Sequence, residues 1–552
     1  MARFIFNMCY TRVCYEETAM SNCKKLKQFT IGESAHRSAC HPPASRTGNG
    51  ELNNFLKPFV SRRDTGALHA NKLYEIFKAK DARFDGRFFV GVSSTGIYCR
   101  PVCTARIPKK ENCSFFSSAA QAEQAGFRPC LLCRPELAPG TAGVDASSAL
   151  ASCAAKLLQE NCGSAESIAY VAQKLGYTDR HVRRVFTEAF HVSSSQYVQT
   201  CRLLLAKSLL TDTQLSMIAV AMASGFGSVR RFNDAFQKRY HMPPSAVRKA
   251  VHARTINSAD ITILLGYRPP YRYNELLDFF ARRAIHGVEL VRDGAYMRTV
   301  RLTNSDGNVI SGWLRVQHVP HKHALSLQIS ESLIPVLPHV ISKVRSMFDV
   351  DSTPHTIAKA LASMNRVRPG LFKNGTRMPG CFEPFEMAVR AILGQQITMK
   401  AACTLASRIA ATSGTAIETE VDGLTTAFPT PHELLRHGAS LTGELSKLGI
   451  IAARAQTIES LAKAFVSGTL SFDIIAAPED TIQKLRAMKG IGNWSAQYIA
   501  MRALSYTDAF LETDYGVKKS LAGYTPQEIR ALSETWKPWR SYATVSLWNS
   551  LQ

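Results

Sequence analysis

The sequence lacks any apolar run long enough to cross a membrane. No window approaches the roughly 18 to 20 uninterrupted apolar residues that a membrane-spanning helix needs. The mildly apolar start at residues 4–9 is short and is soon followed by Arg12, Glu16 and Glu17, a pattern that does not fit a signal peptide. We therefore expect a soluble, cytoplasmic protein without a membrane-embedded segment.

Acidic residues are scarce relative to basic ones. Lys and Arg number 67 against 43 Asp and Glu, which gives a formal net charge of +24. A surplus of positive charge favours a polyanionic partner, because binding phosphates releases their condensed counterions. Nucleic acid is the leading class of partner, and an anionic membrane surface is the second.

Cysteine is absent after Cys403, and the 14 cysteines are unevenly spread before it. Four of them form two close pairs, Cys99 with Cys103 and Cys130 with Cys133. In an unexported protein such pairs are metal ligands more often than disulfides. Four thiolates on two loops suit tetrahedral zinc. From this spacing alone, a purely structural zinc site is favoured over a reactive one.

A chain of 552 residues exceeds what one hydrophobic core can organise. Composition shifts and periodicity predict a multidomain α+β protein, with strands at 88–92, 296–302, 309–316 and 324–329. The predicted regions are 1–67, a disordered leader; 68–139, a small cysteine-paired α/β domain; 147–253, almost entirely helical; 260–353, mixed α/β; and 354–552, all helical.

The residues around the cysteine pairs resemble the N-terminal domain of the Ada family of bacterial adaptive-response proteins. The matching stretches are 85–92, 95–103 and 126–135, together with Arg106, Glu111 and Asn112. The resemblance implies that the first cysteine of the quartet, Cys99, accepts a methyl group from a DNA methylphosphotriester. A zinc-bound thiolate is deprotonated and nucleophilic at neutral pH. Conversion to a thioether removes negative charge, so we expect the methylated site to hold DNA more tightly.

Two helix-turn-helix units follow in tandem. In the first, 167–190, the second helix is capped at Thr178; in the second, which begins at Ser216, the second helix starts at Ser228. A basic helix face is often merely solvated. The tandem arrangement and the run 232–245, however, resemble the AraC-type double helix-turn-helix domain. Side chains near the start of such helices reach base edges in the major groove. The candidates are Arg180, Arg183, Arg230, Arg231 and Asn233.

The order of these two regions is the order found in the Ada family. The resemblance therefore implies a sequence-specific transcriptional regulator with double-stranded promoter DNA as a partner, RNA polymerase as a further partner, and a place at the bacterial nucleoid. The Pro-Cys-His-Arg motif of that family's base-repairing methyltransferase is absent. A different module occupies its place.

That module is marked by a Gly490-Ile491-Gly492 turn between two predicted helices. Its glycines let the backbone approach a DNA phosphate, although such a turn is equally common as a plain helix connection. Further stretches complete a resemblance to helix-hairpin-helix DNA glycosylases, specifically the AlkA family of 3-methyladenine DNA glycosylases. They are 391–397, 513–515 and 536–543, with 268–271 and 276–288 matching that family's N-terminal α/β domain.

The resemblance implies a role for individual residues. Asp514 stands at the catalytic carboxylate, a position where it can also serve as a helix N-cap. Trp494 stands where lyase-competent relatives have an amine nucleophile, so we expect a monofunctional enzyme. The implied pocket aromatics, each of which is individually more often a core residue, are Trp548, Tyr498, Trp494 and Phe279. Gln395 and Gln396 are implied DNA contacts, Gln396 replacing the leucine that fills the gap left by a flipped base.

The sequence therefore predicts a glycosylase that releases alkylated bases such as 3-methyladenine, fused to a zinc-dependent, methylphosphotriester-sensing regulator. A second hypothesis is a regulator whose glycosylase half is a non-catalytic DNA-binding module. Retention of Asp514 together with the hairpin glycines and the aromatics favours the enzyme. The lack of cysteine after Cys403 argues against an iron–sulfur cluster.

Overall fold

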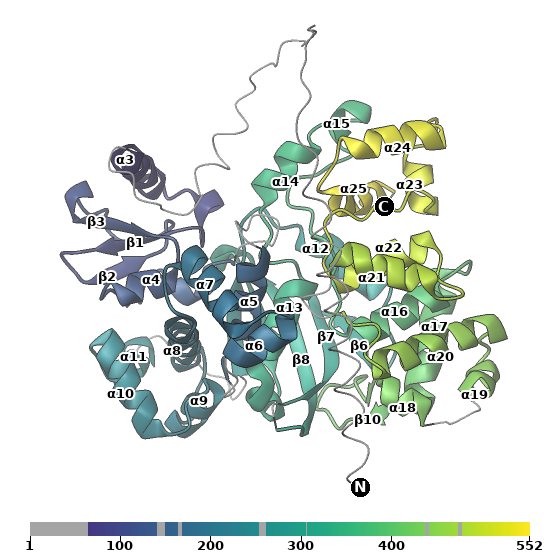
Figure 1. Ribbon diagram of the computed structural model, residues 1–552, viewed down its shortest axis with the longest axis horizontal. Coiled ribbons are helices and arrows are strands. Elements are labelled where there is room, and N and C mark those ends of the chain that lie inside the picture. Colours follow the sequence, from purple (N-terminus) through teal and green to yellow (C-terminus); the bar gives the residue numbers. More distant parts are fainter. Residues whose placement is uncertain are drawn as a thin grey trace, which may run out of the picture. The chain divides into compact units, whose positions relative to one another are not determined.

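The computed structural model describes residues 65–140, 149–163, 168–252, 261–304, 306–436, 441–472 and 477–551 (Figure 1). The predicted leader, 1–67, lies outside them except for the start of helix α3. Within these residues no helix is both long and apolar enough to span a bilayer. The predicted multidomain α+β class is confirmed, because helical regions alternate with two separate mixed regions.

The cysteine-paired region is a small four-stranded sheet with helices beside it. Its elements are α3 (Thr65–Lys78), β1 (Phe89–Val92), β2 (Ile97–Cys99), β3 (Cys113–Phe116), α4 (Ala119–Gln124) and β4 (Arg128–Pro129). The strand order is β3-β1-β2-β4, and β2 pairs with β4 in parallel, Tyr98 opposite Pro129. The parallel pair therefore delivers Cys99 and Cys130 side by side at the ends of neighbouring strands.

The helix-turn-helix region contains seven helices in its described part. They are α5 (Ala149–Glu160), α6 (Ile168–Leu175), α7 (Asp179–Phe190), α8 (Ser194–Asp212), α9 (Met217–Ala223), α10 (Val229–Tyr240) and α11 (Pro244–His252). The predicted cap at Thr178 is confirmed, because its hydroxyl accepts from the N–H of His181. The helix predicted to start at Ser228 is also confirmed, and the Ser228 hydroxyl caps it by accepting from the N–H of Arg231. Both hydroxyls satisfy N–H groups that a helix start leaves unpaired.

The third region is a five-stranded sheet with order β5-β9-β8-β7-β6, antiparallel throughout. Its elements are β5 (Ile261–Gly266), α12 (Tyr273–Ala281), β6 (Glu289–Arg292), β7 (Ala295–Thr303), β8 (Val309–Val319), β9 (Ala324–Ile329) and α13 (Leu337–Met347). The three strands predicted here are confirmed as β7, β8 and β9. The first six residues of β7 are all buried, so both faces of this strand are covered. Tyr296 and Val300 pack in one apolar cluster, and Met297 packs with Trp313 in another.

The fourth region is a helical domain with a short β-ribbon. Its first elements are α14 (Pro354–Leu361), α15 (Met364–Val367), α16 (Pro384–Leu393), α17 (Met399–Ser413), β10 (Thr415–Ala416), β11 (Thr426–Ala427), α18 (Pro431–Leu435), α19 (Leu441–Lys447) and α20 (Ala452–Val466). They are followed by α21 (Pro478–Ala487), α22 (Asn493–Ala503), α23 (Tyr515–Ser520), α24 (Pro526–Glu534) and α25 (Arg540–Asn549). Ile285 and Val288 of the third region share its core, so both regions contribute to one cluster.

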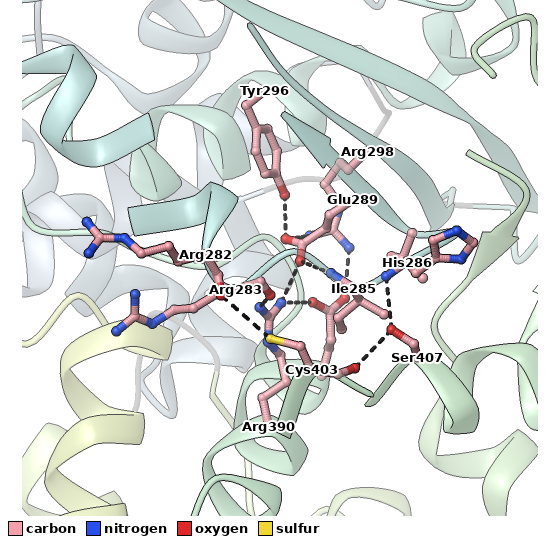
Figure 2. A network of polar contacts seen from close by, with 12 residues as sticks. Arg282, Arg283, Ile285, His286, Glu289, Tyr296, Arg298, Arg390, Cys403 and Ser407 are labelled. Atoms are coloured by element: carbon pink, nitrogen blue, oxygen red, sulfur yellow. Dashed lines mark hydrogen bonds and ion pairs between the residues drawn. The ribbon is translucent and has the colours of Figure 1, made fainter. Parts of the chain in front are cut away.

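A buried ion network joins the sheet of the third region to α16 of the fourth (Figure 2). Arg390 donates to Glu289 at 2.8 Å and to Glu386 at 2.9 Å. Arg298 donates to Glu386 at 2.8 Å, and the Tyr296 hydroxyl to Glu289 at 2.6 Å. Two guanidinium groups are thus matched by two carboxylates. Charges buried this deeply are tolerated when they are paired and hydrogen-bonded.

Candidate methyl-acceptor and base-excision sites

The cysteine quartet is assembled by two turns at one end of the small sheet. The sulfur atoms of Cys99, Cys103, Cys130 and Cys133 all lie within 4.8 Å of one another. Cys103 N–H donates to the Arg100 carbonyl at 3.1 Å and closes the first turn, and Cys130 N–H donates to the Tyr98 carbonyl at 3.0 Å and ties the start of the second turn to β2. Four thiolates at this separation fit a tetrahedral zinc ion at about 2.3 Å from each sulfur.

Arg100 links the quartet to its surroundings. Its backbone N–H donates to Cys133 Sγ at 3.3 Å, and its side chain donates to the Cys133 carbonyl at 3.0 Å. The same guanidinium is paired with Asp85, which is 3% exposed. Hydrogen bonds of this kind fix the orientation of metal ligands. Cys99, Cys103 and Cys130 are buried, and Cys133 is half-buried.

The predicted DNA-contacting residues of the helix-turn-helix region are exposed. Arg180 and Arg183 lie on α7, and Arg183 is paired with Asp179 at 2.8 Å. Arg230, Arg231 and Asn233 lie on the exposed side of α10. Both helices bury their opposite faces, through Val182 and Phe186 in one and Phe232 and Phe236 in the other. Each second helix therefore presents a polar face.

Asp514 is held by three N–H donors. Trp548 Nε1 donates to Asp514 Oδ1 at 2.8 Å, Trp494 Nε1 donates to Oδ2 at 3.0 Å, and the backbone N–H of Val517 donates to Oδ1 at 3.1 Å. The last contact makes Asp514 the N-cap of α23. The capping role is therefore confirmed, and the catalytic role stays a prediction. The two indoles fix where the carboxylate points.

The predicted pocket aromatics gather around this carboxylate. Trp494 stacks on Tyr498 with ring centroids 5.1 Å apart, and Phe279 stacks on Trp548 at 6.0 Å. Tyr498 and Trp548 meet edge to face at 6.2 Å. Trp494 and Trp548 are half-buried, whereas Tyr498 and Phe279 are buried. The structure thus brings all four predicted rings into one cluster.

The predicted hairpin lies between α21 and α22. Gly490 has a φ of +91°, and a Cβ there would meet Thr457 Oγ1 at 2.1 Å, so both conformation and space require glycine. Gln395 Nε2 donates to the Gly490 carbonyl at 2.9 Å. Gln396 is exposed and has a φ of +54°. Ile491 is buried and anchors the turn, while Gly492 is the N-cap of α22.

Sequence reasoning missed three residues of this site. Gly516 follows the catalytic candidate closely, and a Cβ on it would meet Trp548 Cδ1 at 2.8 Å. The other two, Arg283 and Arg502, adjoin the aromatic cluster: Arg502 donates to the Tyr498 hydroxyl at 2.8 Å. A signal existed for Arg502, because it lies four residues after Tyr498 and hence on the same face of α22.

Four family models match the chain in consecutive order. They are the metal binding domain of Ada at residues 72–136, a helix-turn-helix domain at 171–250, the AlkA N-terminal domain at 262–383, and the HhH-GPD superfamily of base excision DNA repair proteins at 389–525. The fold and the sites thus define a class of protein in which a metal-binding, helix-turn-helix half precedes a glycosylase-type half.

Relatives extend over nearly the whole chain. The "Probable bifunctional transcriptional activator/DNA repair enzyme AlkA" of Mycobacterium tuberculosis is 33% identical over 492 residues, which is 87% of this chain and 96% of that protein. The chain belongs to this family of bifunctional AlkA proteins. The "DNA-3-methyladenine glycosylase 2" of Escherichia coli is 35% identical over 51% of this chain and 95% of that protein.

A third relative matches a short stretch of the chain. The "Bifunctional transcriptional activator/DNA repair enzyme Ada" of Escherichia coli is 52% identical over 60 residues, which is 11% of this chain and 17% of that protein. Together with the sulfur geometry, the matched metal binding domain confirms zinc as the cofactor. The helix-turn-helix and base excision repair domains confirm DNA as a partner.

Proposed function

We propose that the C-terminal half is a monofunctional DNA glycosylase that releases alkylated bases such as 3-methyladenine, with Asp514 as its catalytic carboxylate. The observation that carries the proposal is the arrangement around Asp514, where two indole N–H groups aim both carboxylate oxygens from within a cluster of aromatic rings. Rings of this kind stack on a flipped base and favour one that carries positive charge.

The reaction is hydrolysis of the bond between C1′ of the sugar and a ring nitrogen of the base. The bonding electrons leave with the base, and the sugar acquires oxocarbenium character. The Asp514 carboxylate stabilises that positive charge and orients or deprotonates the attacking water. The products are a free base and an abasic site. Trp494 offers no amine, so no Schiff base forms with the sugar through this position.

The test is a base-release assay on alkylated DNA with wild type and Asp514→Asn in parallel. Asparagine keeps the size and capping ability of the side chain but lacks the charge. We expect release to fall by about 10²- to 10⁴-fold while binding to an abasic-site duplex is retained. Borohydride should trap no covalent protein–DNA adduct. Unchanged release by the variant would refute the role of Asp514, and inactivity of wild type would leave the second hypothesis, a non-catalytic DNA-binding module.

We propose further that Cys99 accepts a methyl group from a DNA methylphosphotriester. The Cys99 sulfur attacks the methyl carbon, the carbon–oxygen bond breaks, and the products are a thioether and an ordinary phosphodiester. Bound zinc keeps the quartet deprotonated and nucleophilic at neutral pH. The grouping of the Cys99 sulfur with those of Cys103, Cys130 and Cys133 within 4.8 Å supports the proposal, since four such ligand atoms can hold that zinc ion.

The helix-turn-helix half then acts as a promoter-binding regulator in the bacterial cytoplasm, where it recruits RNA polymerase. Exposed Arg180, Arg183, Arg230, Arg231 and Asn233 support base reading. Removal of one negative charge from the quartet lowers its repulsion from phosphate, so methylation tightens promoter binding, and the gain shrinks as salt rises.

A further inference from the structure

Residue 516, two positions after Asp514, has no room for a side chain. A Cβ on Gly516 would lie 2.8 Å from Trp548 Cδ1, 3.1 Å from Asp514 Oδ1 and 3.2 Å from Trp548 Nε1. These three nearest atoms all belong to the donor and acceptor groups of one hydrogen bond, which runs from Trp548 Nε1 to Asp514 Oδ1 at 2.8 Å. The absence of a side chain at residue 516 therefore makes room for this bond.

The backbone at this position does not itself require glycine. Gly516 lies in the first turn of α23, and its φ is outside the left-handed region, so alanine can adopt the same conformation. Alanine also stabilises a helix more than glycine does, because glycine loses more conformational freedom on folding. What restricts residue 516 is therefore the space beside Trp548, and not the backbone.

The indole of Trp548 is held in place by its other contacts. It stacks on Phe279 with ring centroids 6.0 Å apart and meets Tyr498 edge to face at 6.2 Å. The end of its helix, α25, is tied to the end of α23, because the hydroxyls of Ser520 and Ser550 share a hydrogen bond of 2.6 Å. An added methyl group would therefore lengthen or bend the hydrogen bond to the carboxylate before it displaced the whole helix.

The two oxygens of the Asp514 carboxylate are not equivalent. Oδ1 accepts from Trp548 Nε1 and from the backbone N–H of Val517, whereas among the described residues Oδ2 accepts only from Trp494 Nε1. An ionised carboxylate offers about four lone pairs, two on each oxygen. Oδ1 is thus fully engaged by the protein, and Oδ2 keeps one lone pair for another partner.

We propose that Gly516 is a positioning residue for base excision: it leaves room for the Trp548 indole to fix Oδ1 of Asp514, so that Oδ2 is the oxygen that faces the sugar and the attacking water. The inference rests on the proposed glycosylase function. Trp548 then acts both as a ring of the base pocket and as the donor that orients the carboxylate. Orientation matters because a misplacement of about 1 Å in a reacting group costs about 100-fold in rate.

The test is single-turnover release of 7-methylguanine from a duplex by the full chain, with wild type, Gly516→Ala and the matched control Gly443→Ala. Gly443 is an exposed glycine of helix α19, so the same substitution there faces solvent. We expect Gly516→Ala to slow release by about 10- to 100-fold, because a hydrogen bond to a charged group is weakened, and Gly443→Ala to stay within about 2-fold of wild type. Affinity for an abasic-site duplex should change by less than about 2-fold in both variants, since the hairpin is untouched.

Trp548→Ala provides a second background, because it removes the indole that a Cβ on residue 516 would meet. Release by Trp548→Ala should be slow, and adding Gly516→Ala should change that rate by less than about 2-fold. This comparison also serves if Gly516→Ala alone lacks a normal melting transition.

The indole N–H resonances give a direct readout of the hydrogen bond. The chain has five tryptophans, so a sample labelled with ¹⁵N-tryptophan gives five such signals. The signal of Trp548, assigned by its loss in Trp548→Ala, should shift in Gly516→Ala, whereas that of Trp313 on β8 should stay in place.

Three results would overturn the positioning role and leave the glycosylase standing. They are release by Gly516→Ala at the wild-type rate, an equal loss from Gly516→Ala with and without the indole, and an unmoved Trp548 signal. Failure of wild type to release the base would overturn the proposed function, and the positioning role with it.

Discussion

The cysteine quartet and the Asp514 site position their proposed reactive side chains by opposite means. The quartet gathers four sulfurs within 4.8 Å, as a metal ion requires, whereas two indole N–H groups donate to the Asp514 carboxylate. In the proposed reactions the Cys99 thiolate loses its charge permanently, and the carboxylate recovers its charge after every turnover. Under the proposed reactions, the first site acts once on each protein molecule and the second acts repeatedly.

The largest expected effect is that of Cys99→Ser on methyl uptake, and it tests whether the two sites work independently. We expect complete loss of methyl uptake, measured as a gain of about 14 mass units on the protein after exposure to methylphosphotriester DNA. Promoter binding should no longer tighten, and base release should stay within about 2-fold of wild type, because the two sites share no residue. Cys103, Cys130 and Cys133 should carry no methyl group in the wild-type protein. Persistent uptake by the variant would reduce the quartet to a structural zinc site.

The next largest effect is expected from zinc removal, which should affect the N-terminal half and leave the C-terminal half nearly unchanged. Chelation leaves four thiolates crowded together without their counter-charge, so the small sheet around β1 and β2 should unfold. Exchange protection of amides in residues 89–103 should be lost, while base release falls by less than about 3-fold. Protection that survives chelation would show that the apolar cluster of Leu73, Phe77 and Phe88 holds this sheet without metal.

A smaller effect tests how the Asp514 carboxylate is oriented. Trp494→Phe keeps a ring to stack on Tyr498 but removes the N–H that donates to Oδ2. A hydrogen bond to a charged group contributes about 1.5–3 kcal/mol, so single-turnover base release should fall by about 10- to 100-fold. Affinity for an abasic-site duplex serves as the control and should change little. Retained release would show that the indole N–H does not matter for the chemistry.

The smallest expected effect concerns Asp349, another carboxylate in the same C-terminal half as Asp514. Burial raises the pKa of Asp349 to about 6, against the opposing charge of Arg377. Below pH 4 the Asp349 carboxyl is protonated in both folded and unfolded chains. Between pH 4 and 6 the folded chain keeps this proton and the unfolded chain loses it. The contribution of Asp349 to stability therefore falls as the pH rises through this range. Asp349→Asn removes that loss, and its φ of +50° suits asparagine.

The quantity to compare is the unfolding free energy of Asp349→Asn minus that of wild type. This difference should be about 1–3 kcal/mol larger at pH 7 than at pH 4. Denaturant unfolding at the two pH values measures this difference. Asparagine can still accept from the Tyr542 hydroxyl, which donates to Asp349 at 2.9 Å. If the unfolding free energies of variant and wild type differ by the same amount at both pH values, the raised pKa of Asp349 is contradicted.

Local chemistry made much of the fold predictable. Thr178 and Ser228 precede periodic apolar residues and do cap α7 and α10. The two cysteine pairs do meet, because β2 and β4 run in parallel and end together. Alternation located β7, β8 and β9 in the third region. In each case the decisive interaction lies within a few residues or follows from a strong pattern.

Contacts made across the tertiary fold could not be predicted in the same way. The indoles of Trp494 and Trp548 reach Asp514 from α22 and α25, and no periodicity reveals which side chain a distant N–H will meet. Arg283 follows an apolar helix, and nothing in that pattern indicates that its guanidinium lies over the ring of Phe279. Gly516 is likewise explained only by the closeness of Trp548.

The central claim is that one chain carries two independent DNA repair chemistries, and one duplex containing both a methylphosphotriester and an alkylated base tests it most directly. Wild type, Cys99→Ser and Asp514→Asn are each incubated with this duplex, and methyl transfer to protein and free base are measured in the same sample. We predict both products from wild type, base without methyl transfer from Cys99→Ser, and methyl transfer without base from Asp514→Asn. Loss of both products in either variant, or of neither, would contradict the account.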